Sequence, residues 1–258
     1  MNPDLPSLLR FAHRLADTAR PITLSYFRKP LPVEHKADDS PVTVADRETE
    51  AALRAMIAQH FPGHGIYGEE HGSVNPERPY TWVIDPIDGT RAFISGLPLF
   101  GTLIGLLEQG RPLLGVLEMP ALGERWIGAR EHGSSLNGRP CQVSRCQHLE
   151  QAILYSTSPD MFHGDDLARY QALAATVALR RFGGDCYSYG LLASGHVDLV
   201  VEADLAPYDY LALVPVVENA GGCISDWRGR PLSLDSDGRV VAAATPALHQ
   251  QALARLGA

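Results

Sequence analysis

The sequence predicts an α/β (α+β) protein, because helical and strand patterns both recur along its 258 residues. Apolar residues repeat at helical spacing near the start, over residues 7–28. Two β-rich runs joined by a Glu-Gln-Gly turn then predict antiparallel strands. From about residue 147 onwards, strand and helix patterns alternate to the end of the chain.

In the first half of the chain, a helix is expected over residues 7–28, and two prolines end it. A polar stretch that contains a proline, 36–42, predicts a loop or a short hairpin. Thr43 then has the character of an N-cap, with Asp46 in the first turn of a helix that runs to about residue 60. Strands are expected at residues 65–67, 81–85, 102–107, 113–119 and 126–128.

In the second half, strands and helices are expected to alternate. The expected strands are residues 153–156, 180–182, 197–201, 223–226 and 240–243. The expected helices are residues 165–177, 186–194, 208–219 and 246–256. The simplest architecture is two lobes, 1–145 and 146–258, and functional sites are common at such a junction.

Composition and charge exclude several classes of function. Hydrophobic residues make up 45% of the chain and charged residues 20%, as in ordinary globular proteins. A formal net charge of -8 argues against nucleic acid as a partner. No apolar run reaches the length of about 18 residues that spans a membrane, and the start lacks the pattern of a signal peptide. A cytoplasmic protein is therefore expected, with its four cysteines reduced and mostly buried.

The sharpest chemical feature is the run Asp85-Pro-Ile-Asp-Gly-Thr90. A strand delivers Asp85 to a sheet edge, where Pro86 ends regular pairing because it has no N–H. Gly89 supplies the backbone freedom that turns Asp88 back towards Asp85. Two carboxylates this close repel each other unless a divalent cation lies between them or one is protonated. Oxygen ligands favour magnesium, manganese or calcium over zinc, although an ordinary Asp/Pro/Gly turn would use the same residues.

Other acids could join this pair, but each has a plainer explanation. Glu69 follows a predicted strand as part of a Gly-Glu-Glu run, and Asp209 lies at the start of a later predicted helix. Glu69 would otherwise be a solvated turn residue, and Asp46 and Asp209 would be partners of helix dipoles. If a helix begins near Gly89, the free N–H groups of its first turn suit a phosphate.

Taken together, these segments resemble one known family. The matching segments are Thr43-Val-Ala-Asp46, Gly68-Glu-Glu70, the run from residue 85 to residue 90, and Asp209 with Gly221-Gly222. Their order and rough spacing are similar to those of the inositol monophosphatase superfamily over nearly the entire chain. The resemblance implies a layered α-β-α-β-α sandwich, a homodimer, and hydrolysis of a small phosphate monoester by metal-activated water without a covalent nucleophile.

The resemblance also implies a role for each matching residue. The lobe 1–145 would carry most metal ligands, and the lobe 146–258 would contribute the last ligand and the substrate contacts. Two or three Mg²⁺ ions, with Mn²⁺ as an alternative, would be bound by Glu69, Asp85, Asp88, Asp209 and the carbonyl of Ile87. The attacking water would be activated by Glu69, Thr90 and Asp46. The phosphate would be bound by the backbone N–H groups of Gly89 and Thr90.

Within that superfamily, flanking segments are similar to the histidinol-phosphatase subgroup, over residues 85–104, 181–187 and 202–210. This similarity implies L-histidinol phosphate as the substrate, with Asp185 and Glu202 contacting its non-phosphate end. Acids at that end would attract the ammonium and imidazole groups of histidinol phosphate, which a neutral polyol lacks. Asp185 could equally cap the helix that is expected to begin at residue 186.

Three alternatives stay open at this point. An inositol-1-monophosphatase and a broad-specificity sugar or nucleotide phosphatase would use the same chemistry on another ester. A non-catalytic protein of the same fold could bind a metabolite, but it would have no need of the water-activating pair Glu69 and Thr90. Phosphate release from histidinol phosphate and from inositol 1-phosphate would separate the subgroups.

Overall fold

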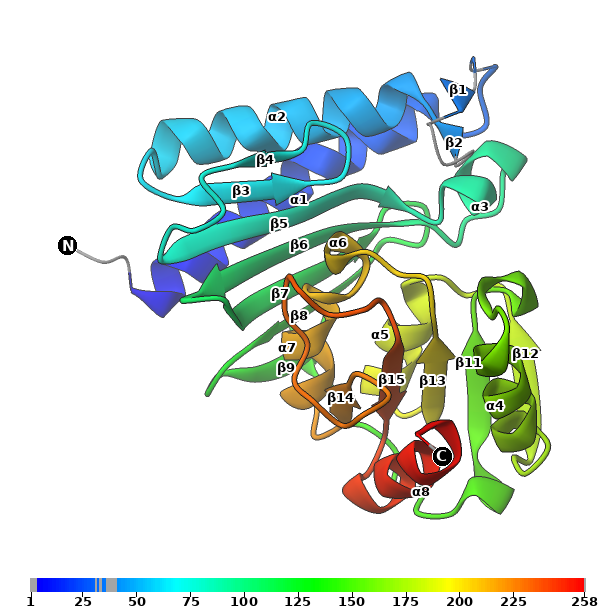
Figure 1. Cartoon of the computed structure of the whole chain (residues 1–258). Coiled ribbons are helices and arrows are strands. Elements are labelled where there is room, and N and C mark those ends of the chain that lie inside the picture. Colours follow the sequence, from blue (N-terminus) through cyan, green and yellow to red (C-terminus); the bar gives the residue numbers. More distant parts are fainter. Residues whose placement is uncertain (1–3, 31, 33, 36–40, 258) are drawn as a thin grey trace.

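Helices and sheets alternate in five layers in the computed structural model, which describes residues 4–30, 32, 34–35 and 41–257 (Figure 1). The layers are α1 (Leu5–Tyr26) with α2 (Val44–His60), an eight-stranded sheet, α5 (Tyr187–Ala193) with α6 (Pro207–Tyr210) and α7 (Leu213–Glu218), a five-stranded sheet, and α4 (Asp165–Ala174) with α8 (Pro246–Leu256). The predicted α/β class and the α-β-α-β-α sandwich are therefore confirmed.

The larger sheet is built by the N-terminal half of the described chain. Its strands are β3 (Gly65–Gly68), β4 (Ser73–Val74), β5 (Tyr80–Asp88), β6 (Gly101–Glu108), β7 (Arg111–Met119), β8 (Glu124–Ala129), β9 (Gly133–Leu136) and β10 (Arg139–Pro140). They lie in the order β10-β9-β8-β7-β6-β5-β3-β4. Neighbours are antiparallel except β3 and β5, which are parallel. A short helix, α3 (Thr90–Ser95), connects β5 to β6.

The smaller sheet is built by the C-terminal half. Its strands are β11 (Ile153–Ser156), β12 (Leu179–Phe182), β13 (Leu199–Glu202), β14 (Cys223–Ser225) and β15 (Val240–Ala243). They lie in the order β12-β11-β13-β15-β14. β11 is parallel to β12 and β13, whereas β15 is antiparallel to β13 and β14. Two short 3-10 helices, Leu149–Gln151 and Pro159–Met161, flank β11.

A short hairpin precedes α2. It pairs β1 (Glu34–His35) with β2 (Pro41–Val42) in antiparallel fashion. This pairing agrees with the predicted loop or hairpin at 36–42, although residues 36–40 of that prediction lie outside the described residues. Thr43 then begins α2, because its hydroxyl accepts the N–H of Ala45 (3.1 Å) while Asp46 accepts the N–H of Thr43 (2.8 Å). The predicted N-cap at Thr43 is confirmed.

Two expectations about local structure are wrong. The single helix expected over 208–219 is divided into α6 and α7, because Pro215 has no N–H to donate to the carbonyl of Leu211. The cysteines are not mostly buried: Cys186 is buried, whereas the other three are half-buried at Cys141, Cys146 and Cys223. The remaining predicted helices and strands are present, with ends that differ by a few residues.

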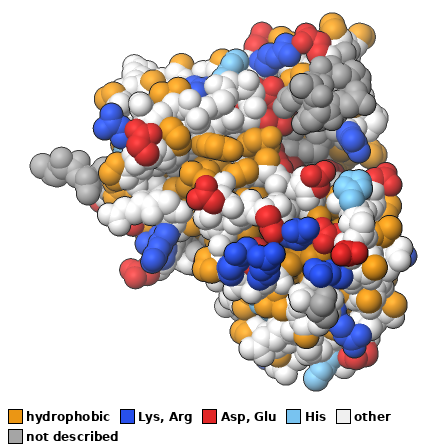
Figure 2. All heavy atoms as spheres, in the orientation of Figure 1, with side chains coloured by type: hydrophobic (Ala, Val, Ile, Leu, Met, Phe, Trp, Pro, Cys, Tyr) orange, Lys and Arg blue, Asp and Glu red, His pale blue; other side chains and the backbone are white. Residues whose placement is uncertain are grey.

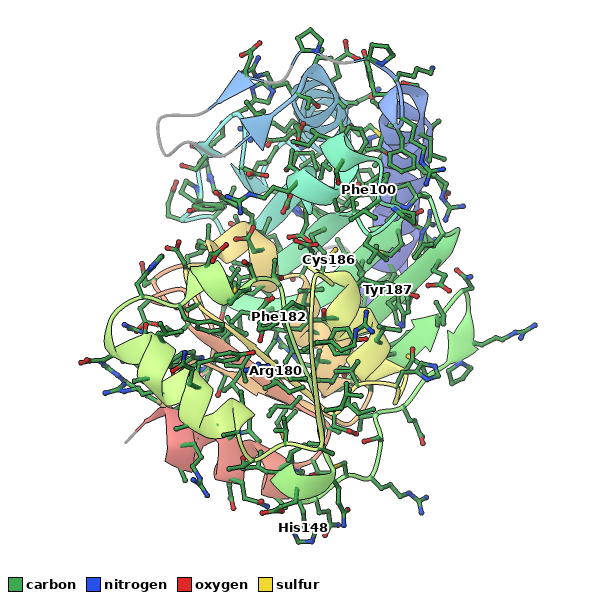
Figure 3. The ribbon with its side chains drawn as sticks, turned by 90° about the vertical axis from the view of Figure 1, so that its right-hand side faces the viewer. Phe100, His148, Arg180, Phe182, Cys186 and Tyr187 are labelled. Carbon is green, nitrogen blue, oxygen red and sulfur yellow. The ribbon has the colours of Figure 1, made fainter. Side chains whose placement is uncertain are left out.

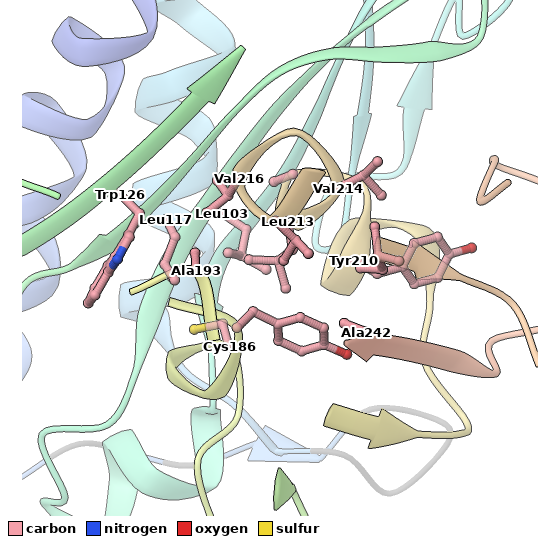
Figure 4. Packing of buried hydrophobic residues seen from close by; sticks show 14 of the residues in the cluster. Leu103, Leu117, Trp126, Cys186, Ala193, Tyr210, Leu213, Val214, Val216 and Ala242 are labelled. Carbon is pink, nitrogen blue, oxygen red and sulfur yellow. The ribbon is translucent and has the colours of Figure 1, made fainter. Parts of the chain in front are cut away.

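Apolar clusters between the layers hold the sandwich together. One cluster lies between the α1–α2 pair and the larger sheet and includes Leu15 and Trp82. The middle cluster joins the other face of that sheet to α5, α7 and the smaller sheet, and includes Leu117, Trp126 and Leu213 (Figure 4). A third lies between the smaller sheet and the α4–α8 pair. Because the middle cluster contacts both sheets, it fixes the two halves relative to each other.

The surface carries both signs of charge. Figure 2 shows Asp and Glu side chains interspersed with Lys and Arg side chains on one face of the molecule. In the C-terminal half, Arg230 pairs with Asp226 (2.6 Å) and Arg239 pairs with Asp166 (2.7 Å). None of the helices in the described part of the chain has the length and apolar character needed to cross a membrane.

Candidate active site

The site begins at an irregularity in β5. Asp85 pairs with Leu103 of β6, but the next paired residue of β5 is Asp88, opposite Gly101, so β5 contains one more residue than β6 between these pairs. In a regular strand, residues three apart would point to opposite faces, and the bulge removes that constraint. Asp85 accepts the N–H of Ile87 (3.0 Å) inside the bulge. The two aspartates therefore reach the same side of the sheet.

Gly89 ends the bulge and begins α3. Its φ of 79° lies in the left-handed region, and a Cβ there would meet the carbonyl oxygen of Leu99 at 2.9 Å. Glycine is thus required for both the conformation and the space. The next residue, Thr90, donates its hydroxyl proton to the carbonyl of Ile87 (3.0 Å). The helix expected to begin near Gly89 is present.

A third carboxylate comes from the C-terminal half of the chain. Asp209 lies in α6, where its Oδ2 accepts the N–H of Ala206 (2.7 Å). One carboxylate oxygen from each of Asp85, Asp88 and Asp209 lies within 4.8 Å of the others. Asp88 is held from the same half, because its Oδ2 accepts the N–H of Cys186 (2.7 Å). Figure 3 shows Cys186 at the boundary between the two halves.

Of the three carboxylates, Asp85 is buried, whereas Asp88 and Asp209 are half-buried. Among the described residues, no Lys or Arg forms an ion pair with any of them. Burial and then the charge of Asp209 raise the pKa of Asp88 to about 7. Burial also raises the pKa of Asp209 to about 7, with a contribution from Glu69. The pKa of Asp85 is well above its usual range for the same reasons, burial first and Glu69 second.

This arrangement fits a divalent cation. Carboxylate oxygens are hard donors, and their number and spacing suit magnesium or manganese better than zinc, which prefers sulfur and imidazole nitrogen. A bound cation would supply the positive charge that the surrounding side chains do not. Calcium prefers the same oxygen donors.

Glu69 and Asp46 approach the cluster from the end of β3 and from the first turn of α2. Glu69 follows β3, and its N–H donates to the carbonyl of Ile84 in β5 (3.2 Å), which places it beside Asp85. Asp46 is 1% exposed and accepts from Thr43 through Oδ2, whereas its Oδ1 has no hydrogen-bond partner among the described residues. Burial raises the pKa of Asp46, and the charge of Glu69 adds to this effect.

The two acids predicted at the far end of the substrate differ in their surroundings. Asp185 has a left-handed backbone (φ 45°), and burial followed by the charges of Asp88 and Glu202 raises its pKa to about 8. Glu202 is 2% exposed, and both its oxygens accept hydrogen bonds, from Thr157 (2.5 Å) and from Tyr189 (2.8 Å). Burial raises the pKa of Glu202, although these bonds oppose the rise.

A cavity of about 230 Å³ collects these groups. It is lined by almost all of the sequence-predicted site residues, namely Glu69, Asp85, Ile87, Asp88, Gly89, Thr90, Asp185, Glu202 and Asp209. Asp46 does not line the cavity and lies beside Glu69 instead. The fold therefore brings together predicted residues that are as far apart as 140 positions in the chain, from Glu69 to Asp209.

Several residues with a role in the site were not predicted. Thr157 and Tyr189 hold Glu202, and the backbone of Cys186 holds Asp88. Glu50 is fully buried in α2, four residues after Asp46, and binds the segment that carries Glu69. A signal for Glu50 does exist: two acids at helical spacing, one turn apart, lie on the apolar face of α2.

Comparison with known proteins shows the family of this chain. The chain matches the inositol monophosphatase family over residues 4–257. The chain belongs to the inositol monophosphatase family. It is 46% identical to a chloroplastic bifunctional phosphatase, IMPL2, of Arabidopsis thaliana, over 96% of this chain and 75% of that protein. It is 41% identical to a histidinol-phosphatase of Chlorobaculum parvum, over 100% of this chain and 98% of that protein.

Solved structures agree with this assignment. An inositol monophosphatase from Zymomonas mobilis superposes with a TM-score of 0.91 at 45% identity, and each chain is covered completely. Membership of the inositol monophosphatase family and its fold, both expected from the sequence, are confirmed. The role of each site residue and the division of the chain near residue 145 stay predictions.

Proposed function

We propose that this member of the inositol monophosphatase family is a Mg²⁺-dependent phosphatase that hydrolyses L-histidinol phosphate to L-histidinol and phosphate. The observation that carries the proposal is the convergence of three carboxylates, which have no Lys or Arg partner among the described residues, beside Glu69 and Thr90 in one cavity. The substrate is suggested by relatives named histidinol-phosphatase that align along almost the whole chain, in Chlorobaculum parvum and in Mycobacterium tuberculosis at 37% identity.

The cation ligands in this proposal are the carboxylates of Glu69, Asp85, Asp88 and Asp209 with the carbonyl of Ile87. When bound, divalent cations neutralise phosphate charge and lower the pKa of water. They would thereby offset the burial, and then the mutual repulsion, that raise the pKa values of these acids.

The neighbouring residues position the reactants. The Thr90 hydroxyl donates to the Ile87 carbonyl, so its oxygen is left to accept a hydrogen bond from the attacking water. Glu69 accepts the proton of that water, and Asp46 contributes negative charge beside Glu69. The backbone N–H groups of Gly89 and Thr90, where α3 begins, bind the phosphate. Phosphoryl transfer needs this positioning and charge neutralisation more than it needs a covalent nucleophile.

The preference for histidinol phosphate would come from an acid that the C-terminal half of the chain contributes to the cavity. Asp185 lines the cavity beside Gly89, and burial followed by the charge of Asp88 raises its pKa to about 8, so its neutral form predominates at pH 7. Among the described residues, Arg91 opposes that rise in pKa, and Arg91 is exposed. A cationic substrate group would stabilise the ionised form of Asp185 and be attracted by it. Inositol 1-phosphate offers no such charge.

A substrate comparison tests the proposal. Phosphate release is measured from histidinol phosphate, inositol 1-phosphate and a sugar phosphate, with Mg²⁺ and with a chelator in excess. The expected result is chelator-sensitive turnover with the highest kcat/KM for histidinol phosphate. A preference of more than about tenfold for inositol 1-phosphate would overturn the substrate, and full activity in chelator would overturn the metal-dependent mechanism.

Asp185→Asn sharpens that comparison. It should lower kcat/KM for histidinol phosphate by about tenfold or more and leave that for inositol 1-phosphate within about twofold. Asp204→Asn is the matched control, because Asp204 also has a left-handed backbone (φ 59°) but is exposed and does not line the cavity. Equal losses on both substrates would remove Asp185 from substrate selection.

A homodimer and a cytoplasmic location complete the proposal. The homodimer rests on the family resemblance, and the cytoplasmic location rests on the expectation drawn from the sequence. Light scattering coupled to size-exclusion chromatography would report the mass in solution, which is expected to be twice the 28.0 kDa of one chain. A mass of one chain at micromolar concentration would overturn the dimer.

A further inference from the structure

We propose that Glu50 is a positioning residue that sets the conformation of the segment carrying Glu69. The inference deepens the proposed function, because it rests on the assignment of Glu69 to the cation and the attacking water. Glu50 itself does not line the cavity. Its effect would be exerted through the backbone of the residues that follow Glu69.

The hydrogen bonds of Glu50 define the position of that backbone. Glu50 is fully buried in α2, and its Oε2 accepts the N–H of Glu70 at 2.6 Å. Its Oε1 accepts the N–H of His71 at 3.1 Å. One carboxylate therefore binds two consecutive N–H groups directly after Glu69. Bonds to an ionised acceptor are short and roughly twice as strong as bonds between neutral groups.

Arg54 pairs with this carboxylate and adds a third attachment. Its Nη1 donates to Glu50 Oε1 (2.9 Å), one helical turn away, and to the carbonyl of Gly72 (2.9 Å). Glu50 therefore has a counter-charge in the protein, whereas no described Lys or Arg pairs with the cluster of Asp85, Asp88 and Asp209. This pair can hold the segment in the same conformation with or without a cation.

The space around Glu50 is equally restrictive. A Cβ on Gly68 would lie 2.1 Å from Glu50 Oε1, so only glycine allows the carboxylate to reach the segment. On the other side, the N–H of Glu69 donates to the carbonyl of Ile84 in β5. Glu69 is thus held between β5 and the three attachments made from α2. A change at Glu50 would weaken the attachments from α2 and leave the hydrogen bond between Glu69 and β5 in place.

Charge neutralisation of Glu50 has a defined effect. In a glutamine, one of the two acceptor oxygens becomes an NH₂ group, which would face either the N–H of Glu70 or the donors of His71 and Arg54. Opposed donors would push the segment away from α2. Glu69 would then contribute less well to cation binding, since groups that orient ligands typically matter by about ten- to a hundredfold.

The control variant has the same hydrogen-bond pattern elsewhere. Asp226 is buried, accepts the N–H groups of Arg228 (2.9 Å) and Arg230 (2.8 Å), and pairs with the side chain of Arg230 four residues on. It lies in the C-terminal half and does not line the cavity. Asp226→Asn and Glu50→Gln thus make the same chemical change to a carboxylate that holds a turn.

The first experiment measures binding of Mg²⁺ alone by calorimetry, together with the melting temperature and steady-state kinetics on the phosphate ester. Glu50→Gln should weaken Mg²⁺ binding by about tenfold or more and lower kcat, with KM for the ester changed by less than about threefold. Asp226→Asn should lower the melting temperature and leave Mg²⁺ affinity within about twofold. Because binding is measured without substrate, an error in the proposed substrate would not affect this result.

Two further variants exclude a merely structural role. Gly68→Ala removes no polar group but displaces the Glu50 carboxylate, so it should reproduce the loss of Mg²⁺ affinity. In a double-mutant cycle, Glu50→Gln should cost little in the background of Glu69→Gln, because both act through the same ligand. Normal Mg²⁺ affinity in Glu50→Gln, or losses that multiply in the double variant, would overturn the inference.

Discussion

Two groups of acids in this protein differ in whether a described Lys or Arg side chain neutralises them. On the α1 side of the larger sheet, Glu118 is fully buried and accepts from Arg20 and Arg125, both at 2.5 Å. Arg125 in turn pairs with Asp17 (2.7 Å). On the opposite side of the sheet, the cluster of Asp85, Asp88 and Asp209 has no such cation among the described residues, although it contains more carboxylates.

The difference shows which group is structural and which needs something bound. A buried charge that is neutralised by the protein is costly to remove, because its partner is left unpaired. A buried charge without a partner is costly to keep. Its replacement by a neutral group removes that cost and the repulsion between it and neighbouring carboxylates. The same chemical change, acid to amide, should therefore have opposite effects on stability in the two regions when metal is absent.

Asp88→Asn should have the largest effect. It removes one cation ligand and one negative charge, so turnover should fall by about a thousandfold or more, equivalent to several kcal/mol. The metal-free variant should nevertheless melt at a higher temperature than the metal-free native protein, because repulsion is relieved. Kinetics and calorimetry with chelator would check both. Near-normal turnover would show that Asp88 is not a ligand.

Glu118→Gln should have the opposite effect on stability. The free energy of unfolding should fall by about 3 kcal/mol, since Arg20 and Arg125 lose their common acceptor inside the protein. Urea titration would measure this loss with and without Mg²⁺. The loss should be the same in both, and Mg²⁺ affinity should be unchanged. A variant that is more stable without metal would make the two regions equivalent.

Thr90→Ala separates charge from chemistry within the cluster. The hydroxyl is neutral, so its removal leaves the charge balance and Mg²⁺ affinity nearly unchanged. Turnover should fall by about a hundredfold, because the attacking water loses an acceptor that orients it. Steady-state kinetics beside a Mg²⁺ titration would check this. If kcat and Mg²⁺ affinity fell together, the hydroxyl would hold the bulge rather than the water.

The sequence predicted the carboxylate cluster better than the residues that hold the site in place, such as Glu50 and Tyr189. Asp85 and Asp88 could be predicted because proline and glycine between them have strict backbone requirements that are visible locally. Their partner Asp209 became a prediction through family resemblance, since no local pattern connects it with residue 85. The fold class followed from periodicity. Pro215 also carries a local signal, because a proline within the expected helix 208–219 indicates a break in that helix.

The residues that hold the site in place depend on contacts between segments that are distant in the sequence. The spacing of Asp46 and Glu50 indicates that they share one face of α2, but it does not reveal the contact of Glu50 with Glu70, because that contact depends on β3 lying parallel to β5 and beneath α2. Likewise, Tyr189 reaches Glu202 because α5 packs against β13. A single sequence contains the residues of such contacts but not the evidence that they meet. These residues therefore appear as ordinary buried polar groups until the fold is known.

The smallest effect concerns pH, and it also distinguishes the two regions. The pKa values of Asp88 and Asp209 are raised to about 7 in the folded protein, from an ordinary value of 3.8. At intermediate pH, the metal-free folded protein thus binds more protons than the unfolded chain, so its stability falls as pH rises through 7. Between about pH 6 and 8, the loss is about 1.4 kcal/mol for each group.

Mg²⁺ should abolish this slope, because cation binding favours the ionised carboxylates. Urea titrations at several pH values, with chelator and with Mg²⁺, would show a falling and a nearly flat dependence. Asp88→Asn should remove part of the slope in chelator, whereas Glu118→Gln should leave the slope unchanged and lower the whole curve. A metal-free protein that became more stable from pH 6 to 8 would mean that the cluster already has a counter-charge.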